Sequence, residues 1–546
     1  MTIKMPRPVK SQLSTATLNR WLPIALILTT AIFLFTYQLG RESLWLDEFN
    51  SLEDIDQSVS AAYKENQLRP LYYLLLMFWA SLGSSDAWLR SLSVIFAVIS
   101  VFLIYRLGRR LAGETEGLIA ALLLTVSPLF ISHAQEIRMY ALSLCLGLAG
   151  TLFVVDALLT ERPHRPAQKT LAGWALFRLL AIYTVPLNIT LLLPDALIVI
   201  WRFRRERRVL VNFAQWLLLL FVLWSPSVLS VIQQSSPDSS YANDHIGAVP
   251  PGPDELIRQL KFLTVWPFPV QSNAIAALFY KLFTPLMAAI IGAGIIRKHR
   301  SPKLLWTCAW LFLPIMPIVA FSYLSVPIWK SRYILFVTPY LFILLAAGFT
   351  RLWQQWKIAA VTLGALYFVA ISGGLIHYYT AQTRTDYKFN VETIEQYEQP
   401  GDAIVWSYEC CSIALMHYYD GSSDIHVHTA KNVKTPATAQ QWVAEFPTGY
   451  DRWWLVTENM GPVIDDVKSA VSNAYNIETV FEYEQGSNVM LLTPRSQSAE
   501  AAAPILKPGK PQSACLYAFA PCSKKTSLAS RFVQDLSTFI QAALFR

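Results

Sequence analysis

Two adjacent carboxylates, Asp47 and Glu48, are the side chains of this sequence best placed to do chemistry. They lie in residues 41–51, R-E-S-L-W-L-D-E-F-N-S, directly after an apolar run at residues 21–40. A run of that length spans a bilayer, so the two acids come just past a membrane boundary. Acids in an otherwise aromatic and apolar segment at such a boundary usually have a function. The alternative is a solvated loop in which the two acids have no special role.

Two further groups of ionisable side chains flank predicted spans. Residues 133–140, H-A-Q-E-I-R-M-Y, carry Arg138, and residues 326–333, V-P-I-W-K-S-R-Y, carry Lys330 and Arg332. The distribution of Lys and Arg among the loops places both groups on the same outer side as the acidic pair. A carboxylate that can accept a proton, facing cations that can hold an anion, is what transfer from a phosphate-linked donor requires.

In that chemistry the acid removes a proton from the acceptor hydroxyl or amine. The cations stabilise the negative charge that builds on the departing phosphate, in a partly dehydrated interface where Coulomb interactions exceed those in water. The sequence contains nothing like a P-loop or a Rossmann glycine fingerprint, which disfavours a soluble nucleotide donor.

The composition indicates an integral membrane protein. Of 546 residues, 54% are hydrophobic, 13% aromatic and only 15% charged, whereas about a quarter of the residues in soluble domains are charged. The net charge of +8 is gathered in short clusters between apolar runs, which indicates membrane topology and not a nucleic-acid partner. Six cysteines fit neither a zinc module nor a disulfide framework.

Apolar runs near the bilayer length predict a polytopic α-helical membrane protein with about 11 transmembrane helices. After them, short apolar strands alternate with helical patterns, which predicts a small α/β domain. The odd number of spans puts this domain outside the cytoplasm. The expected organisation is a cytoplasmic N-terminus at 1–20, a transmembrane catalytic domain at 21–377 with its first outer loop at 41–86, an extracytoplasmic α/β domain at 378–494, and a linker and tail at 495–546.

Three local features lead to specific expectations. An apolar piece at residues 71–82 is too short to cross and predicts a helix lying in the interface. A third span is expected at 117–132 and an eighth at 274–296. Arg178 and Asp195 lie nearly equidistant from the turn of a predicted helical hairpin, so we expect them to pair, because an unpaired charge at that depth costs at least about 2–3 kcal/mol. The alternative is that Arg178 snorkels to the interface.

Five motifs, in order, resemble the bacterial membrane glycosyltransferases of the GT-C class. They are W-L-D-E after the first span, R-P-L-Y-Y-L-L-L-M-F-W from Arg69, Y-R-L-G-R-R from Tyr105, A-Q-E-I-R-M-Y from Ala134 and R-Y-I-L-F-V-T-P from Arg332. The nearest kin are of the protein O-mannosyltransferase and lipid A aminoarabinose transferase type, similar to glycosyltransferase family 39. The resemblance covers roughly residues 20–350.

The resemblance implies a GT-C fold and a glycosyltransferase that uses a polyprenyl-phosphate sugar donor. By position it implies Asp47 as the catalytic base with Glu48 beside it, although Glu48 has a structural role if Asp47 is the base. It implies donor-phosphate contacts by Arg138, Lys330 and Arg332, and positioning roles for Gln135, Glu136, Arg69, Tyr140 and Tyr333. Relatives in this class can bind a divalent cation near the first-loop acid, so a divalent metal ion at Asp47 stays open.

Two departures leave the acceptor and the metal undefined. Arg69 and Pro70 stand where family members commonly have His-Pro, and Tyr183, Thr184 and Val185 stand where many have Tyr-Thr-His. The leading interpretation is an enzyme of the cell membrane with its active site on the extracytoplasmic face, acting on a cell-envelope glycan, lipid or protein. A transporter or flippase of lipid-linked sugars is the alternative. It predicts internal repeats and broken helices near the midplane of the membrane, and the sequence shows no repeat. A membrane scaffold would leave the five motifs unexplained.

Overall fold

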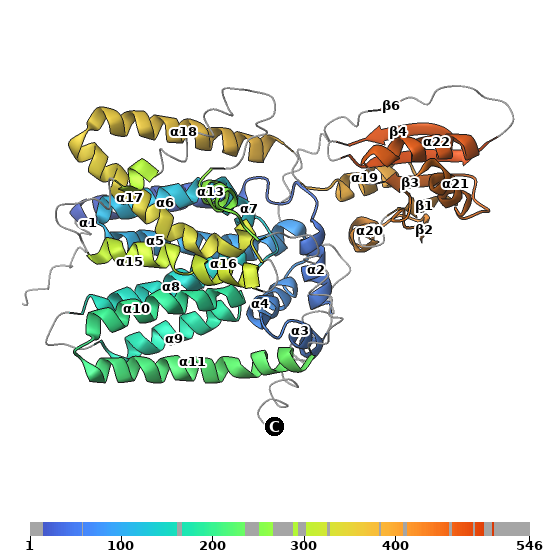
Figure 1. Cartoon of the computed structure of the whole chain (residues 1–546). Helices are drawn as coiled ribbons and strands as arrows, with labels where there is room; N and C mark the ends of the chain where they lie inside the picture. Colours follow the sequence, from blue (N-terminus) through green and yellow to red (C-terminus); the bar gives the residue numbers. More distant parts are fainter. Residues whose placement is uncertain are drawn as a thin grey trace, which may run out of the picture.

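Long apolar helices run side by side through most of the chain, and a small α/β domain follows them (Figure 1). The computed structural model describes residues 15–56, 58–160, 166–234, 250–265, 288–292, 302–324, 328–381, 384–407, 412–457, 461–483, 486–495 and 505–506. The predicted span at 274–296 lies largely outside these residues, as do most of the predicted N-terminal segment and most of the predicted tail.

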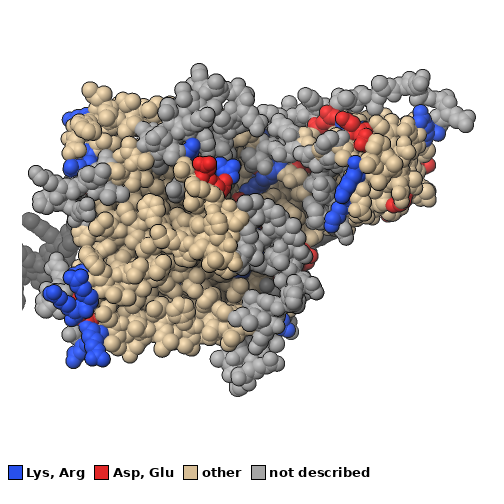
Figure 2. Space-filling view, in the orientation of Figure 1, with Lys and Arg blue, Asp and Glu red and all other residues tan. Residues whose placement is uncertain are grey.

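The helices of the bundle have the following bounds: α1 Thr15–Thr36, α5 Asp86–Leu111, α6 Glu114–Thr125, α7 Pro128–Ala134, α8 Tyr140–Leu158, α9 Gln168–Ile182, η1 Pro186–Leu191, α10 Leu192–Phe203, α11 Arg207–Gln234, α13 Pro253–Phe262, α15 Pro302–Phe312, α16 Ile315–Leu324, η3 Ser331–Val337, α17 Thr338–Gln355 and α18 Lys357–Thr380. Within the described ranges, seven helices are long and apolar enough to cross a membrane, or up to eight if a bent pair counts as one span. On the face seen in Figure 2, a broad part of the bundle shows no charged side chains, and Lys and Arg gather at its left end. The chain is therefore a multi-pass membrane protein.

The third predicted span is not a continuous helix. It consists of α6 and α7, which meet at an angle of 65°. Pro128 has no backbone N–H and takes the first position of α7, while the Ser127 hydroxyl accepts a hydrogen bond from the Phe130 amide at 3.4 Å. A capped, proline-led start favours a new helix over continuation of the old one. The bend leads directly into the turn that carries Arg138.

The predicted pair of Arg178 on α9 and Asp195 on α10 is confirmed. The Arg178 Nε donates to the Asp195 carboxylate at 2.7 Å, and both side chains are fully buried. Two indole N–H groups, of Trp174 and Trp310, donate to the same carboxylate at 2.8 Å each. The Arg178 guanidinium also reaches the Gly147 carbonyl oxygen. The charge pair is thus fully enclosed by hydrogen-bonding partners, as a buried ion pair requires.

Three short helices form the loop between α1 and α5. They are α2 (Leu46–Ile55), α3 (Val59–Glu65) and α4 (Pro70–Ala80). Helix α4 is apolar but has only 11 residues, in agreement with the predicted interface helix. Figure 1 shows the three helices at one end of the bundle, the end that faces the α/β domain. The bundle thus presents α2, with its acidic pair, toward that domain.

The last part of the chain confirms the predicted α/β class. Its elements are α19 Tyr387–Tyr397, β1 Ala403–Trp406, α20 Ser412–Tyr418, β2 Asp424–Val427, α21 Pro436–Ala444, β3 Trp453–Thr457, η4 Gly461–Val463, α22 Ile464–Ala474, β4 Tyr475–Glu482, β5 Asn488–Pro494 and β6 Ile505–Leu506. The strand order is β2-β1-β3-β5-β4-β6, with β1 parallel to β2 and β3, and β5 antiparallel to β3 and β4.

Alternate residues of β1 point into two different apolar cores. Ala403 and Val405 belong to a core formed with α21 and α22. Ile404 and Trp406 belong to the same continuous core as the helical bundle. Because side chains alternate across a strand, one face of the sheet is closed by the domain's own helices while the other packs toward the bundle through α19 and α20.

Candidate active site

The first turn of α2 sends its two acids in different directions. Trp45 precedes the helix in an extended conformation, and its amide donates to the Glu48 carboxylate at 3.2 Å. Acids in a first turn also suit the positive end of the helix dipole. Successive helical side chains are about 100° apart, so the neighbours differ in environment. Asp47 keeps 23% of its side chain exposed, whereas Glu48 is fully buried.

Asp47 lies between two arginines that are distant in the sequence. Arg332, on η3, donates to the Asp47 carboxylate at 2.7 Å. Arg138, in the turn after α7, places a guanidinium nitrogen 3.9 Å from the same oxygen and donates to the Asp47 carbonyl oxygen and the Ser51 hydroxyl at 2.9 Å each. The structure therefore brings together the predicted base and two of the three predicted phosphate-binding cations.

Glu48 is held by donors from three other segments. Arg90, on α5, makes a bidentate contact with it at 2.9 and 3.0 Å, the Ile137 amide donates at 2.8 Å, and Arg384 adds an ion pair. Burial alone raises the pKa of the Glu48 carboxyl, but the charges of Arg384 and Arg90 and the hydrogen bonds outweigh it, so this pKa lies below that of an ordinary glutamate. Glu48 is thus a buried, fully coordinated anion that substrate cannot reach in this arrangement.

Several buried donors around Asp47 have no acceptor. Among the residues that the structure describes, the indole N–H of Trp45, the hydroxyl of Tyr73 and the Nε atoms of Arg138 and Arg332 are buried and have no hydrogen-bond partner. The Arg332 guanidinium lies 5.8 Å from the centre of the Trp45 ring, and Tyr73 lies within electrostatic range of Arg138. Buried polar groups are nearly always paired in native proteins. Unpaired donors around one site indicate an acceptor-rich ligand.

Tyr140 and Tyr333 lie beside the two arginines, and Arg69 contacts Tyr73. The Arg69 guanidinium stacks 5.5 Å from the centre of the Tyr73 ring. Tyr140 is buried within electrostatic range of both Arg138 and Arg332, and Tyr333 packs beside the Arg332 guanidinium at 5.5 Å. Lys330 is partly exposed at the start of η3, and its ammonium has no ion-pair partner in the described part of the chain.

Gln135 and Glu136 do not contact Asp47. The Gln135 amide donates to carbonyl oxygens of α1, among them that of Phe35 at 3.0 Å, and its oxygen accepts a hydrogen bond from Tyr378. Glu136 pairs with His133 at 3.2 Å. Gln135 ties the turn after α7 to α1 and α18, and Glu136 ties it back to α7 itself, so both support the turn that carries Arg138.

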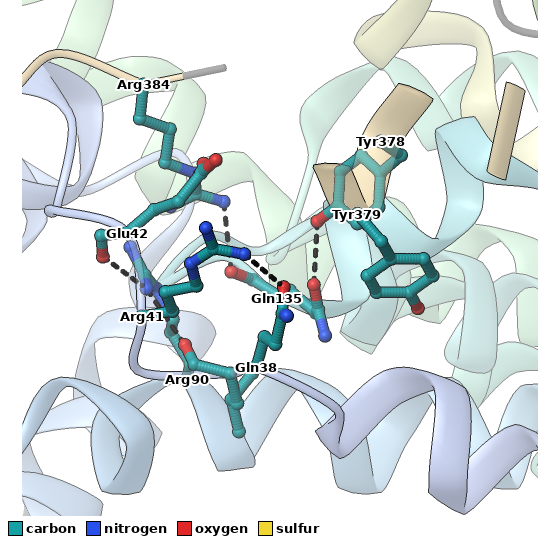
Figure 3. Close-up of a pocket in the computed structure, with 9 residues that line it drawn as sticks. Gln38, Arg41, Glu42, Arg90, Gln135, Tyr378, Tyr379 and Arg384 are labelled. Carbon is teal, nitrogen blue, oxygen red and sulfur yellow. Dashed lines mark hydrogen bonds and ion pairs between the residues drawn. The ribbon is translucent and has the colours of Figure 1, made fainter. Parts of the chain in front are cut away.

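A polar pocket is lined by Arg90 and Arg384, two of the residues that hold Glu48 (Figure 3). It encloses about 320 Å³, part of which is open to solvent, and Asp47 does not line it. The lining residues are Gln38, Leu39, Arg41, Glu42, Arg90, Gln135, Tyr378, Tyr379 and Arg384. The Arg90 guanidinium donates here to the Leu39, Glu42 and Ser43 carbonyl oxygens at 2.9–3.0 Å. The pocket is thus lined by groups that hold the loop after α1.

Arg90 and Arg384 were not among the predicted site residues. Arg90 lies near the start of an otherwise apolar span, and a lone charge there could have suggested a buried acidic partner. Arg384 follows α18 in a polar connection and gives no sequence signal. Four arginines from four segments, Arg90, Arg138, Arg332 and Arg384, therefore surround two adjacent carboxylates.

The residues around Asp47 do not fit a divalent metal ion. No group of three or more His, Cys, Asp and Glu side chains gathers anywhere in the described ranges. The groups that face the Asp47 carboxylate are guanidinium cations, which repel a second cation. The predicted option of a metal at Asp47 therefore receives no support from the ligands at hand.

Part of the chain matches a known protein family. Residues 69–230 match the family model described as dolichyl-phosphate-mannose-protein mannosyltransferase. No curated protein sequence matches the chain significantly.

Among solved structures, ArnT from Cupriavidus metallidurans bound to undecaprenyl phosphate has a TM-score of 0.53 and 12% identity, covering 86% of this chain and 98% of that one. Its apo structure gives the same score and identity, with 88% and 98% covered. The oligosaccharyltransferase of Archaeoglobus fulgidus has a TM-score of 0.47 and 10% identity, with 87% and 74% covered. The matching sequence region and the similar fold agree with the resemblance to the GT-C membrane glycosyltransferases.

Proposed function

We propose that the chain transfers a sugar from a polyprenyl-phosphate donor to an acceptor outside the cytoplasm, with Asp47 as the general base. The observation that carries the proposal is the convergence of Arg138 and Arg332 on the partly exposed Asp47 carboxylate, amid buried donors that lack acceptors. The structurally similar ArnT has been solved with undecaprenyl phosphate, a polyprenyl phosphate of the kind that the proposed reaction releases.

In the proposed reaction the acceptor oxygen or nitrogen attacks the anomeric carbon of the sugar. The bond between that carbon and the phosphate oxygen breaks, and its electrons leave with the lipid phosphate. Asp47 takes the proton from the attacking group. General base catalysis of this kind contributes about 10²–10⁴-fold to a rate.

The arginines supply the charge that the leaving group needs. Arg138 and Arg332 give two positive charges for the single charge of Asp47, so a donor phosphate is attracted even while the carboxylate stays ionised. The planar guanidinium of arginine can also donate two parallel hydrogen bonds to a pair of phosphate oxygens. Lys330 lies two residues before Arg332 and Arg69 contacts Tyr73, and we assign both cations to the outer side of the phosphate. Hydrogen-bond donors that are already held beside the departing phosphate oxygen lower the activation barrier, because they need not reorient as negative charge develops there.

The sidedness follows from the basic residues at the opposite end of the bundle. Helix α5 begins near the site, at Asp86, and ends in Arg109 and Arg110. The Lys303 ammonium donates to the Arg110 carbonyl oxygen at 3.0 Å, so it lies at the same far end. Because Lys and Arg collect on the cytoplasmic side, we propose that Asp47 and the α/β domain face the extracytoplasmic side of the cell membrane.

The test is transfer from synthetic polyprenyl-phosphate sugars in detergent, with cell-envelope extract as acceptor and release of polyprenyl phosphate as the readout. Asp47→Asn removes the base and keeps the size of the side chain, so turnover should fall by about 10²–10⁴-fold. Glu53→Gln is the matched control, because Glu53 is an exposed acid on the same helix; it should retain wild-type turnover.

Equal turnover of wild type and Asp47→Asn would refute the assignment of the base. If the wild type releases no polyprenyl phosphate but moves the intact lipid-linked sugar across vesicle membranes, the protein is a transporter and the proposal is wrong.

A further inference from the structure

Helices α19 and α20 of the α/β domain pack directly against α2. The Phe49 ring is buried within 6.0 Å of the Tyr387, His417 and Tyr418 rings, measured between centroids. The Tyr418 hydroxyl accepts a hydrogen bond from the Leu44 amide at 2.7 Å and donates to the Asp86 carboxylate at 2.9 Å. The domain thus touches the residue two positions after Asp47 and the chain just before α2.

A single side chain extends this contact into the acidic pair. Arg384 lies in the connection between α18 and α19, with only 11% of its side chain exposed. It forms an ion pair with Glu48, donates to the Gln135 carbonyl oxygen at 3.1 Å, and places its Nε 3.7 Å from the Glu42 carboxylate. Figure 3 shows it beside Glu42 and Gln135.

Glu48 therefore bridges the two parts of the molecule. Arg90 holds it from the bundle, and Arg384 holds it from the segment that leads into the α/β domain. The oxygen that Arg384 contacts, Oε2, is also the acceptor for the Trp45 amide at the start of α2. A shift of this oxygen therefore also changes the hydrogen bond that holds the start of α2. Asp47 lies in the same first turn, directly before Glu48.

We propose that Arg384 is a positioning residue for the transfer reaction: it fixes Glu48, and through Glu48 it sets the place of Asp47 relative to Arg138 and Arg332. The segment that leads into the α/β domain then helps to position the catalytic base, in addition to any role of that domain in binding the acceptor. The proposal rests on the proposed function in one respect, the role of Asp47 as the base.

The first experiment separates positioning from stability. Arg384→Gln should lower kcat on the order of 10- to 100-fold, because a displacement of about 1 Å at a catalytic group can cost that much. The KM for the polyprenyl-phosphate sugar should change less than about twofold, since Arg138 and Arg332 remain. Arg384→Lys restores the positive charge without the planar fork, so it should recover part of kcat.

Arg452→Gln is the matched control. Arg452 also forms a mostly buried ion pair, with Asp402, but its contacts are with Asp402, Tyr397 and Trp454 inside the α/β domain. It should lower thermal stability while leaving the kcat of the folded fraction at the wild-type value. If Arg384→Gln affects kcat no more than this control does, the proposal is wrong.

A second measurement asks whether Arg384 acts through Glu48. If it does, Glu48→Gln combined with Arg384→Gln should lose no more activity than the worse single variant, because both remove the same link. Losses in kcat that multiply in the double variant would overturn the proposal.

Hydrogen exchange gives a readout that does not depend on turnover. Amides of residues 44–51 should exchange faster in Arg384→Gln, whereas those of β1 and β3 should exchange faster only in Arg452→Gln. If the wild type transfers no sugar, the proposed function fails, and faster exchange at 44–51 still supports the Arg384–Glu48 link. Unchanged exchange at 44–51 would refute that link.

Discussion

The buried pair of Arg178 and Asp195 offers a quantitative test of the helical packing. Neither side chain is exposed, and the Asp195 carboxylate accepts hydrogen bonds from Arg178, Trp174 and Trp310. Asp195→Asn leaves the guanidinium charge buried without its partner, and Arg178→Gln does the same to the carboxylate. Breaking one side of a buried pair costs about 3–5 kcal/mol, so each single change should lower the free energy of unfolding by about that amount.

The double variant distinguishes a coupled pair from two independent charges. Removing both charges leaves no uncompensated ion, so its loss of stability should be smaller than the sum of the single losses by about 2 kcal/mol. Unfolding in mixed micelles of detergent and SDS, followed by tryptophan fluorescence, measures all three variants, and Trp174 and Trp310 report from the site itself. Additive losses, or a cost below about 1 kcal/mol for Asp195→Asn, would refute the reasoning.

Two further predictions concern stability. The pKa of Glu48 is lowered in the folded protein, so its contribution to stability is present above the ordinary glutamate pKa of about 4.3 and is lost as the pH falls below that value through the folded pKa. The Tm difference between wild type and Glu48→Gln should therefore shrink between pH 4 and 3; a constant difference would contradict it. In Gly117→Ala, the new methyl would lie 2.7 Å from the Tyr105 carbonyl oxygen, so the variant should lose about 1–3 kcal/mol, whereas Gly252→Ala, with open space around it, should not.

Periodicity and charge were sufficient to predict most of the bundle. The hairpin with its ion pair and the short helix at 71–82 depend on apolar length and on the cost of buried charge, which a sequence displays directly. The break at Pro128 was missed because the residues on both sides of it are apolar, so hydropathy continues across it. Only the proline and the Ser127 cap mark the new helix.

Part of the site could be predicted from the positions of the spans. Asp47, Arg138 and Arg332 lie at the ends of predicted spans, and the alternating direction of those spans brings their ends to one side of the membrane. The resemblance favoured Asp47 over Glu48 as the base, but the burial of Glu48 among arginines depends on packing that the acidic dipeptide does not display. The contribution of Arg384 depends on how the α/β domain docks, which no local pattern in residues 378–407 records.

Mutational screens of this acidic dipeptide will be easy to misread. The two neighbours face opposite surroundings, one toward the proposed substrate and one toward a cage of arginines and amides. Loss of turnover after changing either acid would look the same in an activity assay, although one change removes a reacting group and the other loosens its support. Parallel measurements of folding and of turnover are therefore needed to assign chemistry to either carboxylate.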